Sequence, residues 1–235
     1  MISKSSIKQI IIITDGCSNQ GESPVAVAAK AREQGIIVNV IGIIQRNFAE
    51  KAQREIREIA EAGDGLAEFA SLADLSHSMQ VLTRRSMQMT VEKAIQRQLS
   101  SIVGPAGIMA VPPAARSEII ELWENICEDV TLKCLILLDI SGSMQSKLVQ
   151  VEKSVHELLL SFEGRRGKQL VAVAAFPGGN ETLDLVREFR ADTSGIRQCI
   201  SSLKAGGNTP TGPAINQAIG LFEQECYPVC GEYVI

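Results

Sequence analysis

The sequence has few aromatic residues and no excess of positive charge, and both absences exclude classes of partner. Aromatic residues make up 4% of the 235 residues, which argues against the stacking platforms of proteins that bind single-stranded nucleic acids. Lys and Arg number 23 against 27 Asp and Glu, and the formal charge of −4 provides no positive surface for nucleic acid or for an anionic membrane. We therefore expect no nucleic acid and no membrane among the partners.

Long apolar runs are absent as well. The uninterrupted apolar stretches are far shorter than the roughly 20 residues that a membrane-spanning helix needs. The N-terminus shows no basic segment followed by an apolar segment and a cleavage site, which is the pattern of a secretory signal. We expect a cytoplasmic protein.

Cysteine pairs and histidine clusters are also missing. The six cysteines are scattered without a C-x-x-C pair, so reduced thiols are expected in place of disulfides. Cys226 and Cys230 are separated by Pro228 and have no histidine nearby, which disfavours a metal site there. His77 and His156 have no second ligand at metal spacing and are expected to be surface or packing residues.

What the sequence does have is an alternation of short apolar runs with amphipathic segments. Apolar residues make up 45% of the chain, which is enough for the core of one large α/β domain or two small ones. Strands are expected at residues 10–14, 36–43, 65–70, 132–138, 169–176 and 182–189. Helices are expected at residues 24–34, 48–62, 71–102, 118–127, 147–162, 194–203 and 213–225.

This alternation predicts a doubly wound α/β fold with a mostly parallel central sheet and helices on both faces. The short stretch GGNETLDL at residues 178–185 fits a hairpin turn, so one edge strand is expected to be antiparallel.

One helix and one linker stand out in the pattern. In the helix at 71–102 the apolar stripe of the first half resumes out of phase after Thr83, which predicts a kink or a second half that covers another surface. That second half, with Val91 and Ile95, is a candidate docking face. Residues 104–117, GPAGIMAVPPAARS, have the small-residue and proline content of a linker.

The residues that carry chemistry follow the apolar runs. Asp139, Ser141 and Ser143 form D-x-S-x-S directly after the strand at 132–138, and alternate residues of an extended loop project to one side. Carboxylate and hydroxyl oxygens suit Mg²⁺ or Mn²⁺, and no histidine or thiolate in the set favours zinc.

Two further segments supply oxygens. The glycine-rich loop AGGNTPTGPAI at 205–215 carries Thr209 and Thr211 just before a helix, and Asp15 ends the apolar run of the first strand. If the strands before Asp15 and Asp139 are neighbours, both acids lie at the carboxyl ends of central strands, where open α/β sheets place their ligands.

These three motifs, D-x-S-x-S, G-G-x-T-P-T-G and an apolar strand ending in T-D-G, resemble the metal-ion-dependent adhesion site (MIDAS) of von Willebrand factor type A domains. In that family T-D-G comes last, whereas here it comes first, at Asp15. The sequence is therefore similar to a circularly permuted type A domain, of the kind found in small bacterial intracellular proteins. Residues 1–235 would be a single domain in which 7–101 resembles the family's C-terminal half, 102–129 is a linker with a short helix, and 130–226 resembles its N-terminal half.

The resemblance implies a Rossmann-like fold, a ligand set and a function. The metal ligands would be Asp139, Ser141, Ser143, Thr209 and Asp15, the last bound directly or through water. Thr209 is preferred to Thr211 because the family's ligand is the first threonine after the glycine pair, although Asn208 stands between that pair and Thr209. The implied cofactor is Mg²⁺ or Mn²⁺, and the implied function is protein binding in which an Asp or Glu carboxylate of a protein partner completes the coordination of the ion.

Two alternatives remain at this point. An enzyme of the metal-dependent phosphohydrolase type would use Asp139, but Ser141 stands where such an enzyme would need a second acid, and no G-x-x-x-x-G-K-[ST] loop is present. A metal-gated subunit of an ATPase-associated assembly would be a special case of the binding module. The sequence names neither the partner nor the oligomeric state, and it leaves open whether the halves close within one chain or exchange between two.

Overall fold

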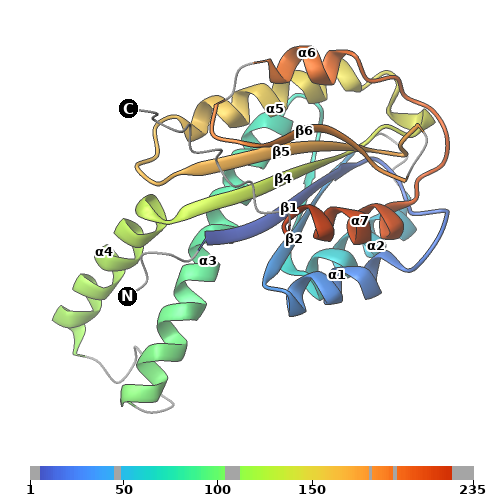
Figure 1. Ribbon diagram of the computed structural model, residues 1–235. Coiled ribbons are helices and arrows are strands. Elements are labelled where there is room, and N and C mark those ends of the chain that lie inside the picture. Colours follow the sequence, from blue (N-terminus) through green and yellow to red (C-terminus); the bar gives the residue numbers. More distant parts are fainter. Residues whose placement is uncertain (1–5, 45–48, 104–111, 180–181, 193–194, 224–235) are drawn as a thin grey trace, which may run out of the picture.

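A six-stranded sheet forms the centre of the computed structural model, which describes residues 6–44, 49–103, 112–179, 182–192 and 195–223 (Figure 1). The strands lie in the order β3-β2-β1-β4-β5-β6. Their bounds are β1 (Ser6–Thr14), β2 (Ile36–Ile43), β3 (Asp64–Ala70), β4 (Thr131–Asp139), β5 (Gln169–Phe176) and β6 (Asp184–Arg190). Neighbouring strands are parallel except β5 and β6, which pair antiparallel. The predicted α/β fold with one antiparallel edge strand is confirmed.

Helices cover both faces of this sheet, as Figure 1 shows. They are α1 (Pro24–Glu33), α2 (Glu50–Ala62), α3 (Leu75–Val103), α4 (Pro113–Asp129), α5 (Leu148–Phe162), α6 (Ile196–Ser201) and α7 (Thr211–Leu221), with a 3-10 turn η2 at Gly142–Met144. One core cluster joins the sheet to α3, α5 and α6, and a second joins its other face to α1, α2 and α7. The doubly wound arrangement is therefore present.

The two central strands β1 and β4 are buried on both faces. Residues 10–13 of β1 and 134–138 of β4 have no exposed surface, and their unbroken β-branched and leucine runs are typical of a strand between two helix layers. The strands run parallel in a register that places Ile13 beside Leu138. Because parallel strands end at the same edge, the residues that follow β1 and β4 meet there.

Helix α1 begins and ends as its sequence predicts. The hydroxyl of Ser23 accepts a hydrogen bond from the backbone N–H of Ala26, and Pro24 occupies the first turn. Gly35 follows the helix at a φ of +70°, a conformation that glycine adopts without steric cost. These local signals fix the chain between β1 and β2.

The phase slip predicted within α3 is wrong, because two polar residues continue the buried stripe. Thr83 and Ser86 are 1% and 3% exposed, and Thr83 donates its hydroxyl to the backbone carbonyl of Met79 at 2.7 Å. A buried residue therefore recurs every four positions of α3, at Leu75, Met79, Thr83, Met87, Val91 and Ile95. Val91 and Ile95 lie in the same core cluster as the first half of the helix, so they are not a free docking face.

The linker predicted at 104–117 is also wrong in its last part. Helix α4 begins at Pro113, five residues before the expected start at residue 118, while residues 104–111 lie outside the described residues. Proline is tolerated in a first helical turn, and the two alanines and the arginine that follow are strong helix formers. Figure 1 shows α4 running beside the second half of α3, away from the sheet.

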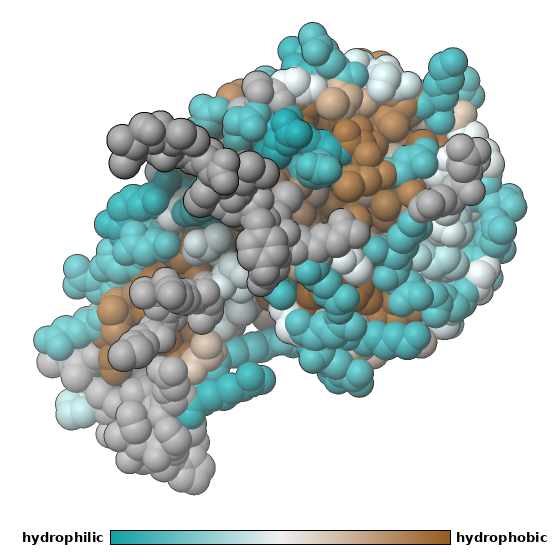
Figure 2. All heavy atoms as spheres, viewed as in Figure 1, coloured by the Kyte–Doolittle hydropathy of each residue, from teal (hydrophilic) through white to brown (hydrophobic). Residues whose placement is uncertain are grey.

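Figure 2 shows hydrophilic side chains over most of one face, with apolar side chains gathered over β5 and β6 and along α4, where Ile120 and Leu122 are exposed. Among the described residues no helix is both long and apolar enough to cross a membrane.

The four described cysteines are free thiols, and burial raises the pKa of Cys134 to about 12. Cys226 and Cys230 lie outside the described residues.

Candidate metal centre

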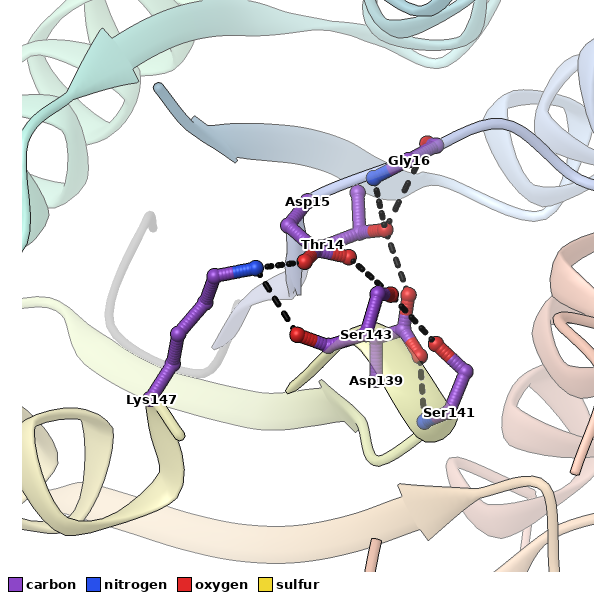
Figure 3. A network of polar contacts seen from close by, with 7 residues as sticks. All are labelled: Thr14, Asp15, Gly16, Asp139, Ser141, Ser143 and Lys147. Carbon is purple, nitrogen blue, oxygen red and sulfur yellow. Dashed lines mark hydrogen bonds and ion pairs between the residues drawn. The ribbon is translucent and has the colours of Figure 1, made fainter. Parts of the chain in front are cut away.

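The carboxyl ends of β1 and β4 bring the acids of two distant segments together. Asp139 is the last residue of β4, and Asp15 directly follows β1. Figure 3 shows both carboxylates in one polar network with Thr14, Ser141 and Ser143. The expectation that the two strands are neighbours is confirmed by their parallel pairing.

Asp139 is the most deeply buried charged group of this network. Its side chain has no exposed surface; Oδ2 accepts a hydrogen bond from the Thr14 hydroxyl at 2.6 Å and Oδ1 accepts one from the backbone N–H of Ser141 at 2.8 Å. Burial raises the pKa of the Asp139 carboxyl, and the hydrogen bonds from Thr14 and Ser141 oppose that rise. The two donors also fix the orientation of the carboxylate.

No cation compensates Asp139 within the part of the chain that the structure describes. Ion pairs there involve other acids, and none joins a lysine, arginine or histidine to this carboxylate. A buried carboxylate without a positive partner is costly, since the lost hydration is not replaced. The Asp139 carboxylate is therefore suited to bind a cation.

The serines extend the network from β4 towards β1. The turn η2 carries the chain sharply away from the strand end, and the fully buried Met144 anchors it in the core. The hydroxyls of Ser141 and Ser143 lie 3.3 Å apart, and the Ser143 hydroxyl donates to Asp15 Oδ1 at 2.7 Å. Asp15, Asp139, Ser141 and Ser143 are thus brought together as the sequence predicts.

The threonine loop lies against the same network. The backbone N–H of Gly206 donates to the carbonyl of Ile140 at 2.8 Å, next to Asp139. On its other side Thr209 donates its backbone N–H to Asn19 Oδ1 at 2.9 Å, and its carbonyl accepts from the backbone N–H of Asn19 at 3.1 Å. Thr209 is 7% exposed, and within the described ranges its hydroxyl makes no hydrogen bond to the other four candidate ligands. The loop is next to the site, and the role of Thr209 stays a prediction.

Two residues of the network were not predicted from the sequence. Thr14 orients Asp139, and Lys147 forms an ion pair with Asp15 and donates to the backbone carbonyl of Ser143 at 2.9 Å. Lys147 directly precedes α5, where a positive charge is unfavourable next to the helix dipole. A lysine at the N-terminus of a predicted helix could therefore have indicated an acidic partner elsewhere in the chain. Burial lowers the pKa of the Lys147 ammonium.

The donor set fits a hard divalent ion. Its candidate groups are two carboxylates and three hydroxyls, all oxygen donors, which Mg²⁺ and Mn²⁺ prefer over sulfur or imidazole. Among the described residues no group of three or more His, Cys, Asp or Glu side chains is placed to hold a metal ion. The candidate site therefore depends on hydroxyls together with its two acids.

Comparison with known proteins gives matches over nearly the whole chain. Two family models, both described as von Willebrand factor type A domain, match residues 3–100 and residues 134–231. The uncharacterized protein YabS of Bacillus subtilis (strain 168) is 38% identical over 220 residues, covering 93% of this chain and 90% of that protein. The crystal structure of an uncharacterized protein from Alicyclobacillus acidocaldarius subsp. acidocaldarius DSM 446 is 38% identical with a TM-score of 0.86, covering 93% of this chain and 94% of that one.

A more distant match is the structure of proximal thread matrix protein 1 from the mussel byssus, whose MIDAS motif holds zinc. It is 16% identical, with a TM-score of 0.33, and covers 96% of this chain and 48% of that one. At this level of likeness the zinc of that protein does not identify the ion of the present site.

Proposed function

The chain belongs to the von Willebrand factor type A family, and on this premise we propose that it is a divalent-cation-dependent protein-binding module. The observation that carries the proposal is the buried Asp139 carboxylate, which has two oriented hydrogen bonds and no ion-pair partner in the described part of the chain. A carboxylate kept in this way needs a cation, and the neighbouring oxygens of Ser141, Ser143 and Asp15 suit Mg²⁺ or Mn²⁺.

The count of donors leads from ion binding to protein binding. With one oxygen from each residue, Asp139, Ser141, Ser143, Thr209 and Asp15 offer five ligands, whereas Mg²⁺ requires six in a near-octahedral arrangement. Ser143 is exposed, so the network opens to the surface on that side. When bound, the ion would act as a Lewis acid that accepts one further anionic oxygen. We propose that an Asp or Glu carboxylate of a partner protein supplies it.

The order of the segments supports a circular permutation. One family model matches the first part of the chain, which carries Asp15, and another matches the later part, which carries Asp139. The strands of the two parts pair along all but their last residues, from Ser6 beside Thr131 to Ile13 beside Leu138. We propose that this pairing restores the sheet of the family from two segments that appear in reversed order.

The phosphohydrolase alternative fits the geometry less well. Hydrogen bonds from Thr14 and from Ser141 to the two oxygens of Asp139 lower its nucleophilicity but leave a lone pair on each oxygen for a cation. The position two residues after it is a serine, which cannot serve as the second acid. Turnover of phosphate esters that requires Mg²⁺ and is lost in Asp139→Asn would overturn our proposal in favour of the phosphohydrolase.

We expect the protein to bind peptides that contain Asp or Glu in Mg²⁺ and to release them in EDTA. The experiment is a peptide array probed in both buffers, in which each binding peptide is also presented with its acid replaced by the amide. Binding should be lost with the amide and with the Asp139→Ala variant, because the ion links the two carboxylates. Cation-dependent binding that survives in Asp139→Ala would contradict the proposal.

A further inference from the structure

We propose that Lys147 is a positioning residue that sets the balance of the site between cation and carboxylate. By holding Asp15 and adding one positive charge, it weakens the hold on the ion and strengthens the attraction of the loaded site for the partner's carboxylate. This inference rests on the proposed function.

The contacts of Lys147 show that it belongs to the site. Its side chain is 3% exposed and that of Asp15 is 4% exposed. The ammonium forms an ion pair with Asp15 Oδ2, while Asp15 Oδ1 accepts from the Ser143 hydroxyl at 2.7 Å (Figure 3). Both oxygens of Asp15 are therefore already engaged by this chain's own groups. A second bond from the ammonium, to the carbonyl of Ser143 at 2.9 Å, ties it to the loop that carries the serines.

The position of Lys147 is unfavourable for a lysine unless it acts on the site. Placing an ammonium out of water is costly, and here it lies directly before α5, at the positive end of that helix. A lysine on the solvent face of the same helix, such as Lys153 at 62% exposure, avoids both penalties. The ion pair with Asp15 compensates the burial, and it joins Lys147 to a candidate ligand that also bonds the Ser143 hydroxyl.

The charges of the network give the direction of the effect. Asp15, Asp139 and Lys147 together carry a net charge of −1, which a divalent ion changes to +1. Without the lysine the loaded site is neutral. A net positive site attracts a carboxylate more strongly than a neutral one, whereas the lysine repels the ion and competes for Asp15. Lys147 should therefore weaken ion binding and strengthen binding of the carboxylate.

The test is the Lys147→Met variant, which keeps an unbranched side chain and removes the charge. We expect its affinity for Mn²⁺, measured by calorimetry, to rise about tenfold, and the affinity of its Mn²⁺ form for acetate to fall about tenfold. Acetate binding is read from water-proton relaxation, since acetate displaces water from the bound Mn²⁺. Acetamide serves as the uncharged probe and should bind equally weakly to both proteins.

Three further variants make the result specific. Lys153→Met, on the exposed face of α5, should change neither affinity. Lys147→Arg keeps the charge and should retain the acetate affinity of the natural protein. Lys147→Gln removes the charge but keeps a hydrogen-bond donor, so it should behave as Lys147→Met does and replaces that variant if it does not fold.

Opposite changes in the two affinities support the inference, because a purely structural role would lower both. Loss of both affinities in the neutral variants, or no change in either, would overturn it. If the natural protein binds no Mn²⁺, or its Mn²⁺ form takes up no acetate, the proposed function fails first and the inference fails with it. The natural protein therefore separates the two failures before any variant is compared.

Discussion

The Asp139→Asn variant is expected to lose the one-to-one binding of Mg²⁺ or Mn²⁺ while it keeps its fold. The amide has nearly the shape of the carboxylate; its oxygen can accept from the Ser141 N–H and its NH2 group can donate to the Thr14 hydroxyl, so the network around it is preserved. The negative charge is lost, and with it the buried anion that we expect to bind the ion. Loss of an outer partner of a metal ligand lowers affinity about 10- to 100-fold, so loss of a ligand charge should lower it by more than about 100-fold.

This variant also has an expected effect on stability. Without an ion, the buried Asp139 carboxylate is uncompensated, so in EDTA the asparagine variant should unfold at the same temperature as the natural protein or higher. Mg²⁺ should raise the unfolding temperature of the natural protein only. The matched control is Asp129→Asn, an exposed acid that precedes β4 at the opposite edge of the sheet; it loses only an exposed ion pair with Arg166 and should leave ion binding unchanged. An unaltered dissociation constant in Asp139→Asn, measured by calorimetry, would contradict the role of Asp139.

The Gly212→Ala variant is expected to destabilise the protein by about 3 kcal/mol and to weaken ion binding, because Gly212 lets the threonine-loop helix approach the first half of the chain. A Cβ atom at Gly212 would lie 2.0 Å from the carbonyl oxygen of Glu22 and 3.1 Å from the backbone nitrogen of Pro24. Backbone atoms at the start of α1 cannot yield as a flexible side chain does. Helix α7 would have to move away from α1, and the loop that precedes it would move as well.

Thermal unfolding measures this effect, and the same helix offers the control. A loss of about 3 kcal/mol corresponds to a fall of roughly 10 °C in a domain of this size. Gly220 also lies in α7, but no atom is within 4 Å of the Cβ that an alanine would place there. Gly220→Ala should therefore be neutral or stabilising by up to about 1 kcal/mol. Equal unfolding temperatures for the two variants would show that the contact between α7 and α1 is not tight.

Much of the sheet could be predicted because each strand carries its own signal. The expected bounds of residues 36–43 and 169–176 agree with β2 and β5, since both segments are apolar at all but one or two positions. The ends of helices were less predictable: α7 begins two residues earlier and ends earlier than expected. The phase slip in α3 was wrongly predicted because the apolar pattern leaves out buried polar residues. Thr83 donates its hydroxyl to a carbonyl of its own helix and can therefore occupy a core position.

The residues of the candidate site were likewise predictable only in part. Asp15, Asp139, Ser141 and Ser143 were predictable because strand ends of a parallel sheet meet at one edge, and short motifs follow each strand. Lys147 was not, because its role depends on an ion pair with a residue from the other half of the chain. Thr14 was hidden for the same reason, since its partner Asp139 is close only in the folded protein. The sequence thus predicts groups at strand ends, and the fold is needed for the pairs between them.

The most direct test of the account is a crystal structure of the protein with Mn²⁺, with anomalous scattering measured at the manganese edge. We predict one anomalous peak at the carboxyl ends of β1 and β4, bounded by Asp139, Ser141, Ser143 and a threonine of the glycine-rich loop, with Asp15 bound directly or through water. The same map would decide between Thr209 and Thr211. A peak elsewhere, or a site that uses oxygens from only one half of the chain, would contradict the claim that the two halves share one ion.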